Sequence, residues 1–226
     1  MGNGIVKNLI FLKDCLLETI YSNDEKCICC GEEIYNGKYI CSKCEKTIRF
    51  CNYGFDIQKE KVSFKCYSIS YYSGPIMNLI LQLKYKGNFL AGQVISEYMI
   101  NLIKSKKIKC DYITYVPMTK KRLKSRGYNQ TMYLSKMLSK SIDIPVINCL
   151  KKIKDTKDQI GLGKEERWKN IKGSFKFSKK YCIENKNILI IDDVITTGAT
   201  AVSCGLELKK YGAAEITILT AAKSRV

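Results

Sequence analysis

The fold of this chain is decided by residues 188–200, which read ILIIDDVITTGAT. Four apolar residues, 188–191, predict a strand that is buried on both faces of a sheet. Asp192 and Asp193 follow at the carboxyl end of that strand, which is the edge where open α/β sheets bind ligands. We expect a loop over 192–198 and a helix over 199–211. The stretch therefore predicts a strand, a loop and a helix, with a ligand site where they meet.

The loop that opens this helix has the composition of an anion site. Its small and hydroxyl-bearing residues are Thr196, Thr197, Gly198, Ala199 and Thr200. Small residues let backbone N–H groups approach a phosphate, and a helix N-terminus favours negative charge. The two preceding carboxylates suit vicinal sugar hydroxyls, because an ionised carboxylate accepts two hydrogen bonds side by side. Together these features predict a receptor for ribose 5-phosphate. The alternative is a plain strand–turn–helix in which Asp and Thr only cap the helix.

Strands and helices alternate along the chain around this unit. Strands are expected within 64–74, 111–116, 144–149, 187–191 and 215–221, and helices within 76–86, 89–104, 129–141 and 199–211. Such an alternation predicts an α/β fold with a parallel central sheet. Residues 150–174 are polar and offer few candidate core residues, which predicts a mobile loop.

Length and composition limit the possible classes of protein. The chain has 226 residues, of which 46% are hydrophobic, enough for one medium domain and a small module. No apolar run approaches the roughly 18 residues that a membrane span needs. Residues 2–20 read as an amphipathic helix rather than a signal peptide, so we expect a cytoplasmic protein without a membrane span. The net charge of +18 favours an anionic ligand without identifying it. The absence of histidine excludes Ser-His-Asp and Cys-His catalysis and histidine metal sites.

The amino-terminal cysteines form a second pattern. The chain has 12 cysteines, and in a cytosolic protein these are thiols or metal ligands rather than disulfides. Two C-x2-C pairs have the spacing that suits one tetrahedral zinc ion, with no open position for catalysis. The pairs are Cys27 with Cys30 and Cys41 with Cys44. Cys29 and Cys51 are alternative ligands, and a group of reduced thiols without metal remains the other interpretation.

The domain boundary is expected where the cysteine-rich sequence gives way to β-rich sequence, near residue 66. We therefore expect an amino-terminal helix and zinc module over 1–66, followed by an α/β domain over 67–226. Since so short a module has little core of its own, metal binding would supply much of its folding free energy.

Several motifs resemble those of one known family. Residues 188–200 closely resemble the phosphoribosyl pyrophosphate motif of type I phosphoribosyltransferases. Further matches, in the order and spacing of the ComF family of competence-associated, phosphoribosyltransferase-like proteins, are 83–87 (LKYKG), Val116-Pro117, 126–130 (RGYNQ), Thr156, Gln159, Arg167, Asn170 and the cysteine pairs. The resemblance covers essentially the whole chain, and several motifs in the right order are more specific than any one alone.

The resemblance implies a type I phosphoribosyltransferase fold that binds phosphoribosyl pyrophosphate together with Mg²⁺ (magnesium). It implies that Asp192 and Asp193 hold the ribose hydroxyls, directly or through magnesium and water. The residues implied to hold the 5-phosphate are Thr196, Thr197, Gly198, Ala199 and Thr200. Those implied in the pyrophosphate and lid loops are Lys120, Lys121, Arg126, Gln159 and Arg167. Catalytic roles fall to Asp192, Asp193, Arg126 and Arg167; loop-anchoring hydrogen bonds are the alternative for Gln159 and Arg167.

Two functions follow from this resemblance. The first is a phosphoribosyltransferase whose acceptor the sequence does not name. Position 196 is Thr rather than the carboxylate that serves some purine-using members as general base, which argues against purine salvage. The second is a non-catalytic module that senses a sugar phosphate, or that holds single-stranded DNA. In either case the resemblance implies a role in natural transformation, with single-stranded DNA and DNA-uptake proteins as candidate partners.

Overall fold

The computed structural model describes residues 26–34, 37–59, 61–154 and 164–224. The chain divides into two compact units, Met1–Lys46 and Thr47–Val226, which are treated separately here. Among the described residues, no helix has the length and apolar character needed to cross a membrane. The amino-terminal helix predicted within residues 2–20 lies outside the described residues.

The large unit is built on a five-stranded sheet in the order β1-β2-β7-β6-β3. The strands are β1 (Phe55–Lys59), β2 (Val62–Tyr71), β3 (Tyr112–Tyr115), β6 (Ile188–Ile195) and β7 (Ile216–Lys223). Strands β2, β7, β6 and β3 run parallel, and only the edge strand β1 is antiparallel to its neighbour. The predicted α/β class with a parallel central sheet is therefore confirmed, with one antiparallel strand added.

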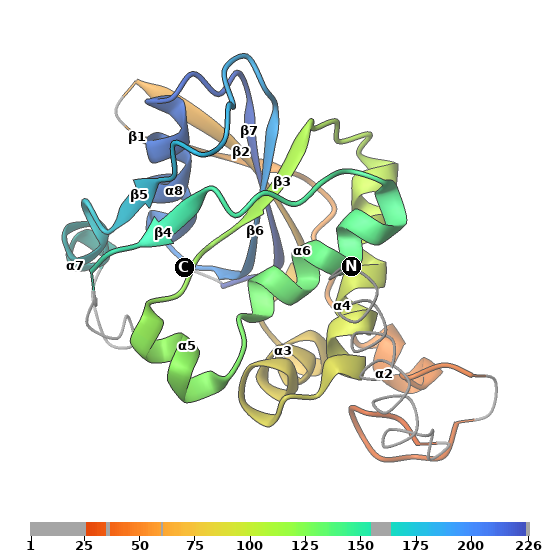
Figure 1. Ribbon diagram of the computed structural model, residues 1–226. Coiled ribbons are helices and arrows are strands. Elements are labelled where there is room, and N and C mark those ends of the chain that lie inside the picture. Colours follow the sequence, from red (N-terminus) through yellow and green to blue (C-terminus); the bar gives the residue numbers. More distant parts are fainter. Residues whose placement is uncertain (1–25, 35–36, 60, 155–163, 225–226) are drawn as a thin grey trace, which may run out of the picture. The chain divides into compact units, whose positions relative to one another are not determined.

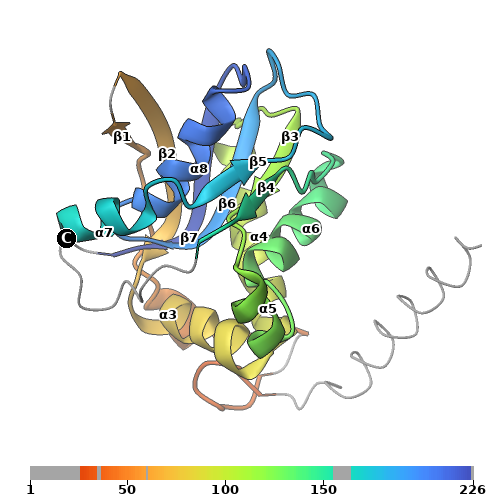
Figure 2. The ribbon, with the colours of Figure 1, turned by 60° about the vertical axis from the view of Figure 1, so that its left-hand side comes forward.

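Helices cover both faces of this sheet (Figures 1 and 2). They are α3 (Gly74–Leu81), the π-helical turn η1 (Gln82–Lys86), α4 (Phe89–Ser105), α5 (Lys120–Arg126), α6 (Gln130–Ile142) and α8 (Ala199–Lys209). Helices α4 and α6 pack against each other and on one face, whereas α8 covers the other. The carboxyl ends of β3 and β6 lead directly into the loops before α5 and α8, so both loops lie at the same edge of the sheet.

Strand β6 is longer than the sequence predicted. Residues Asp192 and Val194 stay in register with Thr220 and Ala222 of β7, so the strand ends at Ile195 and the expected loop over 192–198 shrinks to three residues, 196–198. Successive side chains of a strand point to opposite faces of the sheet. The two aspartates therefore belong to different faces, a detail that their adjacency in sequence conceals.

The expectation of a coreless loop over 150–174 is wrong for the described part of that segment. It contains β4 (Leu150–Lys152) and α7 (Lys164–Ile171). Strand β5 (Phe175–Phe177) begins directly after it. Strands β4 and β5 pair with each other, and Leu150, Ile171 and Phe175 are buried in the same apolar cluster as β6 and α8. The described part of the segment has few apolar residues; Leu150 and Ile171 reach the core, whereas Ile153 is exposed. The strand predicted at 144–149 is reduced to a single bridge between Val146 and Ile113.

The small unit contains the helix α2 (Ser42–Lys46) and an isolated bridge between Lys26 and Glu33. It ends earlier than the boundary predicted near residue 66, because β1 and β2 are integral strands of the large sheet. The prediction left β1 in the cysteine module because the boundary was set where cysteine-rich sequence gives way to β-rich sequence; pairing with β2 places it in the other unit.

Candidate functional site

Asp192 lies at the mouth of a small pocket where β6 meets α8. The pocket has a volume of about 20 Å³ and is lined by Asp192, Val194, Ile195, Thr196, Gly198, Ala199, Thr200 and Ala201. Burial raises the pKa of Asp192 well above its usual value, and the neighbouring charge of Asp193 raises it further. A carboxylate that is hard to ionise alone is one that gains from a cation or from hydrogen-bond donors. The pocket thus places the carboxylate of Asp192, whose charged form a cation or hydrogen-bond donors would stabilise, beside the predicted phosphate loop.

The loop over 196–198 presents backbone N–H groups at the start of α8. Gly198 is the N-cap residue of the helix, with a φ of +76°, and it has no side chain with which to cap the first turn. The hydroxyl of Thr197 accepts a long hydrogen bond of 3.4 Å from the Ala199 N–H. The other orphan N–H groups of a first helical turn are those that bind anions in proteins. This geometry fits the predicted phosphate cradle.

Gly198 should be intolerant of a side chain, for a reason that lies in its backbone. A Cβ atom there would contact Cδ1 of Ile57, the flexible end of a side chain on β1, but the left-handed φ is fixed by the turn. We expect Gly198→Ala to cost about 1–2 kcal/mol of unfolding free energy, the usual penalty for a β-carbon in that region. Urea denaturation measures the loss. Combining the change with Ile57→Val removes the contact but not the backbone strain, so full recovery in the double variant would contradict this explanation.

Asp193 points to the opposite face and is held by two side chains. Its Oδ2 atom is 3.3 Å from Nζ of Lys84 and accepts a 2.7 Å hydrogen bond from Nε2 of Gln130. The side chain of Asp193 is largely buried and that of Lys84 is about one quarter exposed, at 28%. The charge of Asp193 raises the pKa of Lys84, so the ammonium form is favoured. In the absence of a ligand, the carboxylate is therefore neutralised from within the chain.

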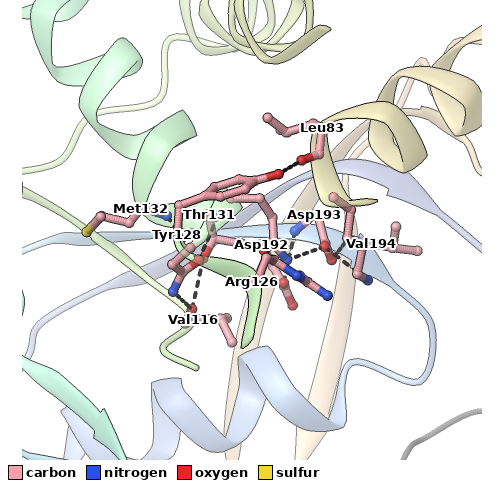
Figure 3. A network of polar contacts seen from close by, with 12 residues as sticks. Leu83, Val116, Arg126, Tyr128, Thr131, Met132, Asp192, Asp193 and Val194 are labelled. Atoms are coloured by element: carbon pink, nitrogen blue, oxygen red, sulfur yellow. Dashed lines mark hydrogen bonds and ion pairs between the residues drawn. The ribbon is translucent and has the colours of Figure 1, made fainter. Parts of the chain in front are cut away.

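Arg126 joins this network through Gln130 (Figure 3). Its guanidinium donates a 2.8 Å hydrogen bond to Oε1 of Gln130, while the amide nitrogen of the same glutamine donates to Asp193. The guanidinium also lies 5.4 Å from the ring centroid of Tyr85, which follows Lys84 in the chain. Gln130 thus links the guanidinium of Arg126 to the carboxylate of Asp193 through two hydrogen bonds. The predicted importance of Arg126 thus has a structural counterpart, one residue removed from Asp193.

In the segment 126–130, each residue makes a different structural contribution. Gly127 ends α5 with a φ of +82°, a conformation that a glycine adopts without strain. The hydroxyl of Tyr128 donates to the carbonyl of Leu83, which fixes the turn that carries Lys84. Asn129 caps α6 by accepting from the N–H groups of Thr131 and Met132. Positioned in this way, Gln130 at the start of α6 reaches Asp193.

Thr131 and Asn129 also tie α6 to the end of β3. Both side chains donate to the carbonyl of Val116, at 2.8 Å from the threonine hydroxyl and 3.2 Å from the asparagine amide (Figure 3). Val116 directly follows β3, next to β6 in the sheet. Residues 126–131 therefore hold η1, the end of β3 and the start of α6 around the carboxylate of Asp193.

The structure does not bring all predicted residues together. Lys120 and Lys121 are exposed on α5, and no contact joins them to either aspartate among the described residues. Arg167 lies half-buried on α7, with its Nε atom lacking a hydrogen-bond partner there. Gln159 lies outside the described residues. Conversely, Lys84 and Gln130 were not predicted as site residues; their membership in the LKYKG and RGYNQ motifs was the available signal.

The four paired cysteines of the small unit converge. The sulfur atoms of Cys27, Cys30, Cys41 and Cys44 all lie within 4.8 Å of one another. Backbone N–H groups point at two of the sulfurs, from residue 41 to Cys27 at 3.3 Å and from residue 44 to Cys41 at 3.4 Å. Burial raises the pKa of the Cys27 thiol, but several backbone hydrogen bonds outweigh it and lower that pKa to about 6. Among the described residues, neither Cys29 nor Cys51 belongs to this group.

Comparison with solved structures finds several phosphoribosyltransferases among those with a similar fold. An adenine phosphoribosyltransferase from Thermoanaerobacter pseudethanolicus aligns with 79% of this chain and 84% of its own, at 15% identity and a TM-score of 0.42. No family model matches the sequence.

Comparison with curated proteins gives relatives along most of the chain. "Competence protein F" of Haemophilus influenzae is 30% identical over 216 residues, covering 85% of this chain and 94% of the relative. "DNA utilization protein YhgH" of Escherichia coli is 24% identical, with 85% and 87% covered. "Competence protein ComFC" of Streptococcus pneumoniae is 25% identical, with 86% of both chains covered. The 30% identity to the Haemophilus influenzae protein, of which 94% is covered, shows that the chain belongs to the ComF family of competence proteins.

Proposed function

We propose that the chain binds phosphoribosyl pyrophosphate with Mg²⁺ at the carboxyl end of β6. The observation that carries the proposal is the joining of Asp192 to an uncapped helix N-terminus in one pocket. Backbone N–H groups of the 196–200 loop take the 5-phosphate, and the carboxylates take the sugar hydroxyls or a magnesium ion. Oxygen ligands from carboxylates, together with substrate phosphates, are what magnesium prefers in proteins.

The basic residues near Asp193 supply charge for the rest of the ligand. Lys84 and Arg126 both lie over the ring of Tyr85, at 5.9 Å and 5.4 Å from its centroid. They place two cations next to a carboxylate on the face opposite Asp192. Such cations stabilise a departing pyrophosphate by electrostatic attraction. We infer that Lys84 joins Arg126 in this role, whereas the exposed Lys120 and Lys121 act only through long-range attraction, and Arg167 and Gln159 stay candidates for a closing segment.

The small unit fits structural zinc. Sulfur atoms at the corners of a tetrahedron with Zn–S bonds of about 2.3 Å are separated by roughly 3.8 Å. The Cys30 and Cys41 sulfurs are 3.6 Å apart, and all four lie within 4.8 Å. N–H groups directed at Cys27 and Cys41 favour the thiolate that a metal requires. We therefore propose that zinc holds this unit together, and that the protein works in the reducing cytoplasm.

The biological setting comes from the relatives. Their names connect them with competence and DNA utilization, and we propose that this chain likewise serves the uptake or use of DNA. A phosphoribosyl transfer to an acceptor not yet identified is the reaction that the site could support. Position 196 is Thr and supplies no carboxylate, so the acceptor would need its own acidic proton or a base from elsewhere.

Isothermal titration of the purified protein with phosphoribosyl pyrophosphate tests the proposal. We expect saturable binding that strengthens when magnesium is present, because the metal links carboxylates to the pyrophosphate. Ribose 5-phosphate should bind more weakly, since it lacks the pyrophosphate that Lys84 and Arg126 would meet. Equal binding of inorganic phosphate and phosphoribosyl pyrophosphate would show that the site recognises only an anion, and the proposal would fail.

A further inference from the structure

A second, larger pocket lies on the outer side of α8, away from the phosphate loop. Its volume is about 420 Å³, within the range of small-molecule sites. It is bounded by β1, by the segment from α7 to β5, and by one stripe of α8 formed by Ser203, Leu206, Glu207 and Lys210. These positions recur at i, i+3, i+4 and i+7, the spacing of a single helix face. In Figure 2, α7 and β5 lie beside α8. The residues of the first pocket, 192–201, do not line this one.

The pocket is strongly basic. Four lysines line it: Lys59, Lys169, Lys172 and Lys210. Among its lining residues the single carboxylate is that of Glu207, and this group is already engaged. It accepts 3.0 Å from Nζ of Lys210 and 3.1 Å from the Phe177 N–H. Three of the four lysines therefore have no carboxylate among the lining residues to neutralise them, and an anionic group would be attracted to the pocket.

An aromatic ring stands beside this charge. Trp168 lines the pocket and also packs against the apolar cluster below α8. The ammonium of Lys59 lies 4.7 Å from the centroid of its ring. A cation held over an aromatic face is positioned without being neutralised. The pocket therefore offers both a fixed cation and a flat apolar surface.

A buried hydroxyl at the pocket lacks a partner. Ser174 is fully buried, yet its Oγ atom makes no hydrogen bond within the described structure, and it is a lining residue. Leaving a buried polar group unsatisfied costs free energy that a ligand's hydrogen bond would recover. This hydroxyl distinguishes the pocket from an accidental gap between lysines.

We propose that this pocket binds a free nucleoside phosphate. The lysines meet the phosphate, the planar base lies against Trp168, and Ser174 meets a polar atom of the ligand inside. Its location on the outer face of the helix that carries the phosphate loop makes it a separate site. The inference does not depend on the function proposed for the first pocket.

The experiment uses Trp168 as its own reporter, because it is the chain's single tryptophan. Adenosine 5′-monophosphate is titrated into the full-length protein while tryptophan emission is followed, with excitation at the red edge where adenine does not absorb. We expect a saturable change. The double variant Lys169→Ala/Lys172→Ala should weaken it about tenfold or more, as expected for the loss of two charged hydrogen-bond donors.

Two matched variants separate this site from bulk charge and from the first pocket. Lys176→Ala/Lys179→Ala removes the same charge from exposed lysines outside the lining and should leave the titration unchanged. Asp192→Asn/Asp193→Asn should also leave it unchanged, even where binding of phosphoribosyl pyrophosphate is lost. The proposal is overturned by a missing fluorescence change, by equal losses in both lysine pairs, or by loss in the aspartate variant. It is equally overturned if inorganic phosphate matches the nucleotide, or if a single-stranded oligonucleotide binds far more tightly than the nucleotide.

Discussion

Replacing both Asp192 and Asp193 with asparagine should weaken binding of phosphoribosyl pyrophosphate with magnesium by at least about a hundredfold. Each carboxylate would lose a charge-assisted interaction of roughly 1.5–3 kcal/mol. The amides keep the shape of the side chains, so the loss reports charge rather than packing. Gln130 and Lys84 contact Asp193 in the parent protein. In the double variant, both side chains can hydrogen-bond to other groups or to water instead. Titration calorimetry in the presence and absence of magnesium measures the difference.

The control for this experiment is Asp143→Asn. Asp143 is exposed at the carboxyl end of α6, in a left-handed conformation that asparagine also tolerates. It makes the same chemical change at the far end of the helix that begins with Gln130, and binding should not alter. If the double variant bound the ligand as tightly as the parent, the sugar site would lie elsewhere and the central proposal would be wrong.

The single change Asp192→Asn should stabilise the fold, in contrast to its unfavourable effect on ligand binding. Burial and the charge of Asp193 raise the pKa of Asp192 in the folded state. The folded protein therefore holds a proton more tightly than the unfolded chain, whose aspartates titrate near about 3.9. The free energy of unfolding must then fall as the pH rises above that value and through the folded pKa. Asparagine removes this penalty, so the variant should melt at a higher temperature than the parent at neutral pH, with the gap closing in acid.

The second large effect is expected in the small unit. Substituting Cys41 with serine should release the zinc and unfold residues 26–46, because structural zinc contributes on the order of 10 kcal/mol to such modules. Inductively coupled plasma mass spectrometry should find about one zinc per chain in the parent and little in the variant. Limited proteolysis should cut the variant within this unit while the unit beginning at Thr47 resists.

Cys29→Ser serves as the matched control for the zinc prediction. Cys29 lies between two proposed ligands but outside the group of converging sulfurs. It should keep its zinc and its resistance to protease. A parent protein purified under reducing conditions without chelator, and found free of zinc, would refute the assignment.

The parts of the fold that the sequence predicted are those with a continuous local pattern. Residues 188–191 are apolar without interruption, and Gly198 marks the turn before α8, so the starts of this strand and helix were predicted, although β6 continues to Ile195. The segment after Leu150 was misjudged because its core residues are separated by lysines and follow no short period. Their burial becomes evident only from the pairing of β4 with β5, which lies further along the chain.

The candidate site divides in the same way. Its carboxylates and proposed phosphate loop are contiguous in sequence, so residue types alone were enough to predict a role for them, and that role stays a prediction. The cations and the amide that hold Asp193 come from η1 and α6, which are brought together only by folding. Lys84 is one lysine among many in a basic chain, and only its place in the LKYKG motif sets it apart in sequence from those on the surface. Distance along the chain conceals such partners, whereas the cysteine group was predictable because its pairs repeat at a regular spacing.

Because Lys84 forms an ion pair with Asp193, its ammonium group competes with free cations for that carboxylate. A tethered ammonium 3.3 Å from the carboxylate has a far higher effective concentration than any free ion in solution. Magnesium on its own must expel this resident charge and gains little in return. A metal that arrives bound to a polyphosphate offers the displaced ammonium a new anion, so the exchange loses no pairing. Metal and sugar phosphate should therefore bind cooperatively, each raising the affinity for the other by the same factor.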